Sequence, residues 1–329
     1  MAVTTFRSTD ASAPVLSGTA GSLVDLFDTC LVGSGTAYGA LPKKGWTKPQ
    51  TGTSKGVYTT VDGIGFLRVM HDGTQAGSGG LREAVVRGAE GATTVDALID
   101  PFPLVADVSD TNCVWRVSTT VDATARPWVL VADANWFILT VEYSGTLSDL
   151  YIFGRYSRTR SANSWPYIVN TRDATTAADH RAGTACSGYV ASVANARMYA
   201  MRSADGVTKA PVAIFLTESS NSSIANGIPG RTGPRFPDSD GIIFQSSPQL
   251  WINNGPGATV AEPAPSGFFP NLWSPMHNTA EVGSTAVYGD TFTAVSYDPS
   301  ANFLISGGKS DAAGKWIIET TDTWQDPLA

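Results

Sequence analysis

The sequence predicts a mainly β protein: an antiparallel sandwich or barrel with one short N-terminal amphipathic helix and long, ordered loops rich in Pro and Gly. Two observations lead to this fold class. Short apolar segments bounded by Gly, Asp, Asn and Pro recur at roughly ten-residue spacing, which is typical of antiparallel β architectures. Only 16% of the 329 residues are charged, so the chain is poor in the Lys and Glu that favour exposed helices.

The single helix is predicted close to the N-terminus. Pro14 blocks a helix until Ser17 or Thr19, either of which can cap one. Apolar residues then recur at three- and four-residue spacing, which predicts a helix over 20–32 that ends before Gly33. The predicted apolar face consists of Leu23, Leu26, Phe27, Cys30 and Leu31.

The remaining elements are predicted to be strands. Residues 2–9 alternate between two faces, as expected of an edge strand or an extended arm. The clearest pair covers 128–131 and 136–141, where residues 132–135 form the loop of a hairpin. The other predicted strands cover 57–60, 64–70, 81–89, 114–118, 150–156, 188–202, 211–216, 241–245, 289–296, 302–306 and 315–320.

The chain is interpreted as one structural unit with four parts: an arm and helix (1–50), a β-rich core (51–218), a proline-rich region (219–275) and C-terminal strands that return to the core (276–329). Nine of the nineteen prolines lie in the third part. Because proline cannot donate a hydrogen bond to a β-ladder, we expect long loops there with only one or two short strands.

Residues that carry chemistry are scattered. The three cysteines (Cys30, Cys113 and Cys186) and the three histidines (His71, His180 and His277) show no metal-ligand or nucleophile spacing. We therefore predict free thiols, no metal site, no cofactor and no enzymatic activity. A pair of carboxylates assembled by the fold for glycan hydrolysis stays open as an alternative.

Charge and hydropathy narrow the expected partners. The net charge of −7 argues against nucleic-acid binding, which needs a basic surface. No apolar run approaches the ~20 residues that span a bilayer, and the N-terminus has no signal-peptide pattern. We therefore expect a protein made in the cytoplasm without a membrane span.

Aromatic and Arg residues are the expected source of binding energy, because both are enriched at contacts between proteins. The arm, the helix and the proline-rich region are the candidate binding elements. The candidate interface residues are Phe6, Pro14, Leu16, Trp46, Arg155, Arg158, Trp165, Trp251 and Trp273. In an alternative interpretation, Trp165, Trp251 or Trp273 stacks on a sugar.

Several segments carry a resemblance to a known family. The opening motifs SAPVLSG (12–18), GSLVDLF (21–27) and GWTK (45–48) resemble the start of a group of tailed-bacteriophage virion proteins. Similar likenesses are found in AVVRGA (84–89), PFP (101–103), DATARPWVLVAD (122–133), FPNLWSPMH (269–277), GDTF (289–292) and ETTDTW (319–324). Phe153-Gly154 also matches, although Arg155 stands where the family often has an acidic residue.

The resemblance implies a structural role in a virion and supplies no catalytic residue. We expect a homo-oligomeric component made in the host bacterial cytoplasm that binds other virion proteins, in the tail, neck or baseplate. Capsid decoration is one alternative. A receptor-binding or carbohydrate-binding adsorption protein that contacts a host glycan is another, and a glycan hydrolase a third.

Overall fold

The computed structural model describes residues 3–33, 44–73, 80–105, 113–142, 148–158, 166–170, 198–202, 214–216, 245–246, 249–252, 264–275, 293–294, 303–306 and 316–321. Within these ranges the chain is mainly β, with antiparallel sheets and one short α-helix. The predicted fold class is therefore confirmed as a sandwich-like assembly of sheets. None of the sheets formed by the described strands closes into a barrel.

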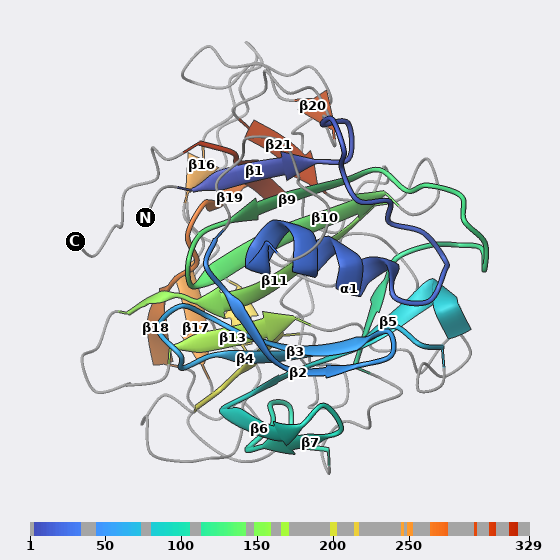
Figure 1. Cartoon of the computed structure of the whole chain (residues 1–329). Helices are drawn as coiled ribbons and strands as arrows, with labels where there is room; N and C mark the ends of the chain where they lie inside the picture. Colours follow the sequence, from blue (N-terminus) through green and yellow to red (C-terminus); the bar gives the residue numbers. More distant parts are fainter. Residues whose placement is uncertain are drawn as a thin grey trace.

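Two sheets are built from the first two thirds of the chain. The central sheet has the order β1 (Thr4–Arg7), β9 (Trp128–Ala132), β10 (Trp136–Glu142), β11 (Ser148–Arg155), β13 (Tyr167–Asn170) and β14 (Met198–Ala200). The N-terminal sheet has the order β2 (Thr47–Gly52), β3 (Lys55–Thr59), β4 (Phe66–Met70), β5 (Glu83–Ala89) and β8 (Val114–Arg116). A 3-10 turn (Gly80–Arg82) precedes β5, and the hairpin of β6 (Gly91–Thr94) and β7 (Ala97–Ile99) follows it (Figure 1).

The C-terminal part forms two further sheets. One has the order β12 (Ser157–Arg158), β18 (Ala264–Phe268), β17 (Gln249–Ile252) and β15 (Ile214–Leu216). The other has the order β16 (Gln245–Ser246), β19 (Leu272–Pro275), β22 (Trp316–Glu319), β21 (Phe303–Ser306) and β20 (Thr293–Ala294). Among the described strands only β20 and β21 pair in parallel.

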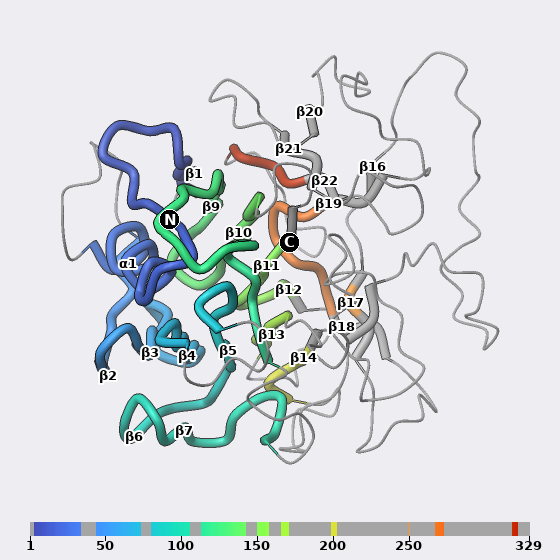
Figure 2. The backbone as a smooth tube through the Cα atoms, turned by 90° about the vertical axis from the view of Figure 1, so that its right-hand side faces the viewer, coloured from blue at the N-terminus to red at the C-terminus, as the bar shows by residue number. Residues whose placement is uncertain are grey.

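The sheets are stacked in layers. Figure 2 shows the N-terminal sheet with helix α1 (Ser22–Phe27) on one side, the central sheet in the middle, and the C-terminal sheets on the other side. The central sheet is therefore covered on both faces. Its strands β9 and β10 are buried along nearly their whole length, which explains why their sequences read as continuous apolar runs.

Neighbouring residues of the central strands enter different cores. Leu130, Phe137 and Leu139 pack with α1 and the N-terminal sheet, whereas Val129 and Ile138 pack toward the C-terminal sheets. This is the period-two alternation of a strand, with apolar residues on both sides. The predicted hairpin is confirmed, since β9 and β10 pair in antiparallel fashion around residues 133–135.

The helix forms where the sequence predicts it but begins later. Its first residue is Ser22, and the residue before it, Gly21, has a left-handed conformation with φ of 86°. The predicted caps are wrong: Ser17 Oγ bonds the Thr19 hydroxyl instead, at 2.7 Å, and no side chain caps from Gly21. The last turns (Asp28–Val32) widen into a π-helix that ends at Gly33, with φ of 80°, as predicted.

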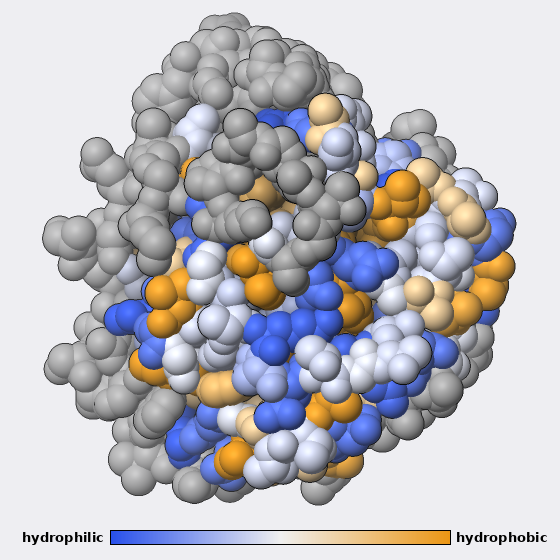
Figure 3. Space-filling view, viewed as in Figure 1, coloured by the Kyte–Doolittle hydropathy of each residue, from blue (hydrophilic) through white to orange (hydrophobic). Residues whose placement is uncertain are grey.

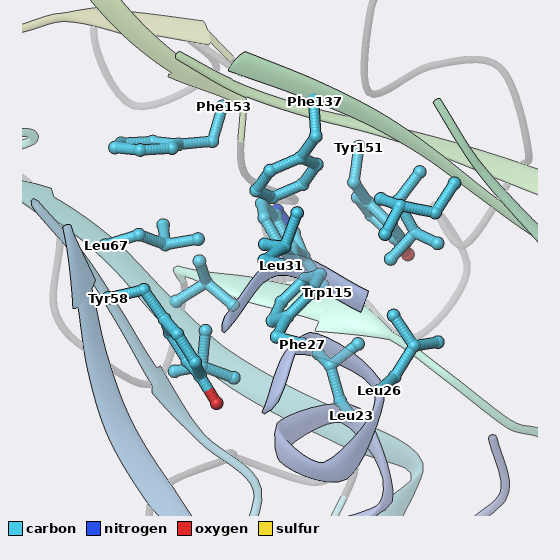
Figure 4. Close-up of a cluster of buried hydrophobic side chains, with 14 of the residues drawn as sticks. Leu23, Leu26, Phe27, Leu31, Tyr58, Leu67, Trp115, Phe137, Tyr151 and Phe153 are labelled. Carbon is cyan, nitrogen blue, oxygen red and sulfur yellow. The ribbon is translucent and has the colours of Figure 1, made fainter. Parts of the chain in front are cut away.

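The apolar face of the helix fills the core between the N-terminal and central sheets. Figure 4 shows Leu23, Leu26, Phe27 and Leu31 directed into a cluster of side chains from both sheets. The Phe27 ring lies 5.7 Å from Tyr58 and 5.1 Å from Phe137, measured between ring centroids. The predicted apolar face is confirmed, and it packs against other parts of the same chain.

The proline-rich region contains more strands than predicted. Its described residues form β16, β17, β18 and β19, not one or two short strands. Pro265 lies within β18, opposite Trp251, where the register with β17 shifts by a bulge. A bulge is one of the few places in a sheet where a missing N–H donor is tolerated, so the prolines permit this pairing.

Strand β1 forms one edge of the central sheet, as predicted for residues 2–9. Ser8 N donates to Trp128 O across the pairing with β9. Asp10 bonds both backbone groups of Arg7: Arg7 N donates to Asp10 Oδ2 at 2.8 Å, and Asp10 N donates to Arg7 O at 3.1 Å. Thr5 Oγ1 donates to Thr320 O at 2.7 Å, so a C-terminal segment also lies against this edge.

Candidate interaction surface

Two of the segments that carry the family resemblance meet at the N-terminal arm, residues 8–20. Arg126 N donates to Leu16 O at 2.8 Å, and Trp128 Nε1 donates to Pro14 O at 3.1 Å. These contacts join the motif at 12–18 to the motif at 122–133, more than a hundred residues later. The arm is therefore held along the sheet by hydrogen bonds to fixed backbone and side-chain groups.

Gly18 allows the arm to lie close to the backbone of Thr120 and Val121. A Cβ atom placed on Gly18 would come within 1.8 Å of Thr120 O and 3.1 Å of Val121 Cα. No residue with a side chain fits there without moving the backbone. The requirement for glycine in this motif is thus one of space between two chain segments.

Three candidate interface residues do not lie on the surface. Phe6, Leu16 and Trp46 are 1%, 0% and 2% exposed, and all three belong to the core beside α1. Trp46 Nε1 also donates to Asp133 O at 3.0 Å. The prediction that these side chains contact a neighbouring subunit is corrected, because packing within the chain already surrounds them.

The helix is corrected in the same way. Five of its six residues are buried. Its sixth residue, Asp25, is exposed, and in the π-helical turn that follows, Asp28 is bound to Lys48 at 2.8 Å and accepts from the Tyr58 hydroxyl at 2.9 Å. Helix α1 therefore holds two sheets together and offers little surface to a partner.

The exposed part of the arm adjoins an exposed loop, and we call residues 11–15 together with 120–125 the arm–loop surface. Val15 is 57% exposed and Val121 is 59% exposed. Every residue of 120–125 is exposed, and Asp122 carries the one charge in both segments. In Figure 3 apolar residues lie along the right-hand edge, where Figure 1 places the dark-blue arm and the green loop.

Hydrogen bonds fix the shape of the loop. Asp122 Oδ1 accepts from Thr120 Oγ1 and from Thr124 N, each at 2.9 Å. The hydrogen bonds from Thr124 lower the pKa of Asp122, so this carboxylate stays ionised at neutral pH. Arg126 donates to Ser118 Oγ at 3.0 Å and to Thr120 Oγ1 at 2.8 Å. These hydrogen bonds hold the turn in a conformation that leaves the side chain of Val121 exposed.

Sequence reasoning missed both exposed valines. A signal was present, since Val121 belongs to a Thr-Thr-Val-Asp turn that recurs at 59–62 and 93–96. In the turn at 59–62, Thr60 Oγ1 likewise donates to Asp62 Oδ1, at 2.7 Å, and Val61 is 45% exposed. In both turns, the side chains of Thr and Asp bond each other, and the valine between them is exposed.

Arg155 is the last residue of β11, and it lies at the end of the central sheet opposite to the arm. Its side chain is 44% exposed and sits 3.6 Å from Asp62. Asp62 accepts a 2.6 Å hydrogen bond from the Tyr167 hydroxyl, and burial together with this bond raises the pKa of Tyr167. Arg155 thus stabilises a contact between the N-terminal and central sheets and is not near the arm–loop surface.

The remaining candidates are placed only in part. Pro14 belongs to the arm, and its carbonyl binds Trp128. Arg158, Trp251 and Trp273 lie on β12, β17 and β19, where the structure describes the backbone. Trp165 lies outside the described residues. Among the candidates whose side chains the structure describes, Arg155 therefore lies apart from Phe6, Leu16 and Trp46.

Potential metal ligands are dispersed over the described ranges. No three His, Cys, Asp or Glu side chains there gather into a group able to hold a metal ion. Cys30 and Cys113 are both buried, and burial raises the pKa of Cys30, which disfavours the reactive thiolate. Among the described residues, no helix has the length and apolar character that crossing a membrane would require.

Comparison with known proteins gives no further assignment. No protein-family model matches the chain, and no curated protein matches its sequence.

Proposed function

We propose that this chain is a structural component of a tailed-phage virion that binds neighbouring virion subunits, in the tail, neck or baseplate. The observation that supports it best is the arm–loop surface. Two of the segments that resemble virion proteins bond each other there, and together they display an exposed, nearly uncharged face. Val15 and Val121 are 57% and 59% exposed, although both lie between segments anchored to the core.

The physical argument concerns the cost of ordering on binding. A loop that is already fixed by Asp122 and Arg126 loses little conformational entropy when a partner covers it. Exposed valines add apolar area whose burial is favourable, at about 25 cal/mol per Å². A rigid, weakly charged surface of this kind suits a lasting contact between subunits.

The test is incorporation into particles. A chain with Val15→Asp and Val121→Asp should fold normally but be lost from purified particles, because charges would have to be buried at the contact. Val105→Asp is the matched control, since Val105 is 56% exposed and lies outside the arm–loop surface. We expect the control chain to be incorporated like the parent.

Localisation decides the remaining alternatives. Density for the chain in a reconstruction of the intact particle would assign it to the tail, neck, baseplate or capsid. Absence of the parent chain from purified particles would overturn the proposal. Specific binding of the purified chain to a host glycan would instead favour an adsorption protein.

A further inference from the structure

A buried histidine joins four separate segments of the N-terminal layer. The backbone of His71 accepts from Gly21 N at 2.8 Å and donates to Ser54 O at 2.9 Å. Its ring Nδ1 lies 3.3 Å from Leu23 N, and its ring Nε2 lies 2.9 Å from Leu81 O. One residue thus connects the end of the arm, the first turn of α1, the β2–β3 turn and the segment before β5.

These partners dictate the protonation state of the ring. Leu23 N–H can only donate, so Nδ1 must be the unprotonated acceptor. Leu81 O can only accept, so Nε2 must carry the hydrogen. His71 is therefore held as the neutral tautomer with its proton on Nε2.

The surroundings favour the neutral ring. His71 is 0% exposed, and burial lowers its pKa despite opposing effects from the Leu81 carbonyl and two carboxylates. The charged groups that act on it are Asp25 on α1 and Asp72, the next residue in the chain. Asp72 is itself paired with Lys55, the first residue of β3, at 3.0 Å, and burial is the largest effect on the ring.

We propose that His71 is an acid-sensitive latch that holds the arm and the first turn of α1 onto the N-terminal sheet. A proton added at Nδ1 would face the Leu23 N–H at 3.3 Å, so two donors would oppose each other, and the Ser22 hydroxyl oxygen 3.5 Å from Nδ1 already accepts from Ser17 N. The charged ring would also have to remain buried or move toward water. Either outcome separates residues 16–25 from β4 while the central sheet stays folded.

The direction of the pH effect follows from the two states. In the open state the imidazole is solvated and titrates near its ordinary pKa of about 6.5. In the closed state the pKa of His71 lies below that value. The open state therefore binds more protons on acidification, and the latch is fully closed above about pH 6.5 and weakens as the pH falls below it.

Hydrogen exchange of the full chain tests the latch. His180→Gln and His277→Gln remove the other two imidazoles, so that only His71 can titrate as a histidine. Between about pH 7.5 and about pH 5, exchange of residues 16–25, corrected for the intrinsic rate, should rise, by at most about thirtyfold for an open-state pKa of about 6.5. Exchange in β9 and β10 should not change. An equal rise in β9 and β10, or no rise at 16–25, would overturn the proposal.

A substitution that cannot titrate provides the control. In His71→Asn, the side-chain oxygen can still accept from Leu23 at every pH, so the acid-induced rise should disappear. The same rise in His71→Asn as in the parent would also contradict the latch. If this variant does not fold, ring-nitrogen NMR of the parent replaces it, and the titration of Nδ1 must then coincide with the opening at Leu23.

Discussion

The two faces of the central sheet are packed by different means. Toward α1, three Trp and three Tyr side chains each donate a hydrogen bond from within the core. They are Trp46, Trp115, Trp128, Tyr58, Tyr151 and Tyr167. Toward the C-terminal sheets, the core side chains that the structure describes are mostly aliphatic, with Trp136, Tyr156 and Phe269 as the aromatic ones among them.

The difference separates directional from non-directional packing. An indole N–H fixes the distance and angle to one backbone oxygen, as Trp115 Nε1 does with Asn170 O at 2.6 Å. Aliphatic side chains such as Val131 and Ile152 can repack with small rotations. We therefore expect the face toward α1 to set the relative position of the segments, and the other face to be more tolerant.

The largest expected effect comes from emptying the core beside the helix. Phe27→Ala removes a ring that contacts Tyr58, Trp115 and Phe137, and should lower the free energy of unfolding by about 3–5 kcal/mol. Ile152→Val on the opposite face should cost about 1 kcal/mol. Urea denaturation measures both, and equal losses would contradict the comparison.

A smaller effect is expected where a glycine accommodates one of the tyrosines. A Cβ atom on Gly65 would lie 2.3 Å from Tyr167 Cε1, and the Tyr167 hydroxyl is held by Asp62. Gly65→Ala should therefore cost about 1–3 kcal/mol in thermal or chemical denaturation. Gly91→Ala is the control, because its nearest neighbour would be Ile99 Cδ1 at 3.4 Å. If both variants unfold like the parent, the tyrosine is not rigidly held.

The smallest effect isolates a single hydroxyl. Tyr58 OH is 3.1 Å from Val24 O and 2.9 Å from Asp28 Oδ1, so Tyr58→Phe should lower the free energy of unfolding by about 1–2 kcal/mol. The ring is kept, and the apolar contacts with Phe27 remain. A variant as stable as the parent would show that directional bonds contribute little on this face.

The sequence predicted correctly those elements in which apolar residues recur at one regular spacing. The face of α1 and the strands of the β9–β10 hairpin were found from apolar spacing, because helix and strand geometry act over a few residues. The start of the helix was predicted two residues too early, at 20 instead of Ser22. Its position depends on Gly21 and on His71, fifty residues away, and no local cap marks it.

Long-range partners explain the errors at the candidate surface. Phe6, Leu16 and Trp46 read as free apolar residues in a polar N-terminal region, yet each is covered by chain that comes more than a hundred residues later or by α1. The exposed valines have the opposite cause. Val121 lies in a turn whose hydrogen bonds direct it outward, and the signal for that orientation is the recurring Thr-Thr-Val-Asp motif, not the spacing of apolar residues.

The contact between Asp10 and Arg7 limits how copies of this chain can associate. Because a carboxylate and an amide of the same chain already bond both backbone groups of Arg7, an extra strand cannot continue the central sheet at this point. Growth into fibres by lateral strand addition is thereby blocked at that end. Copies that associate at this point of the edge must therefore do so without extending the β-ladder of the central sheet.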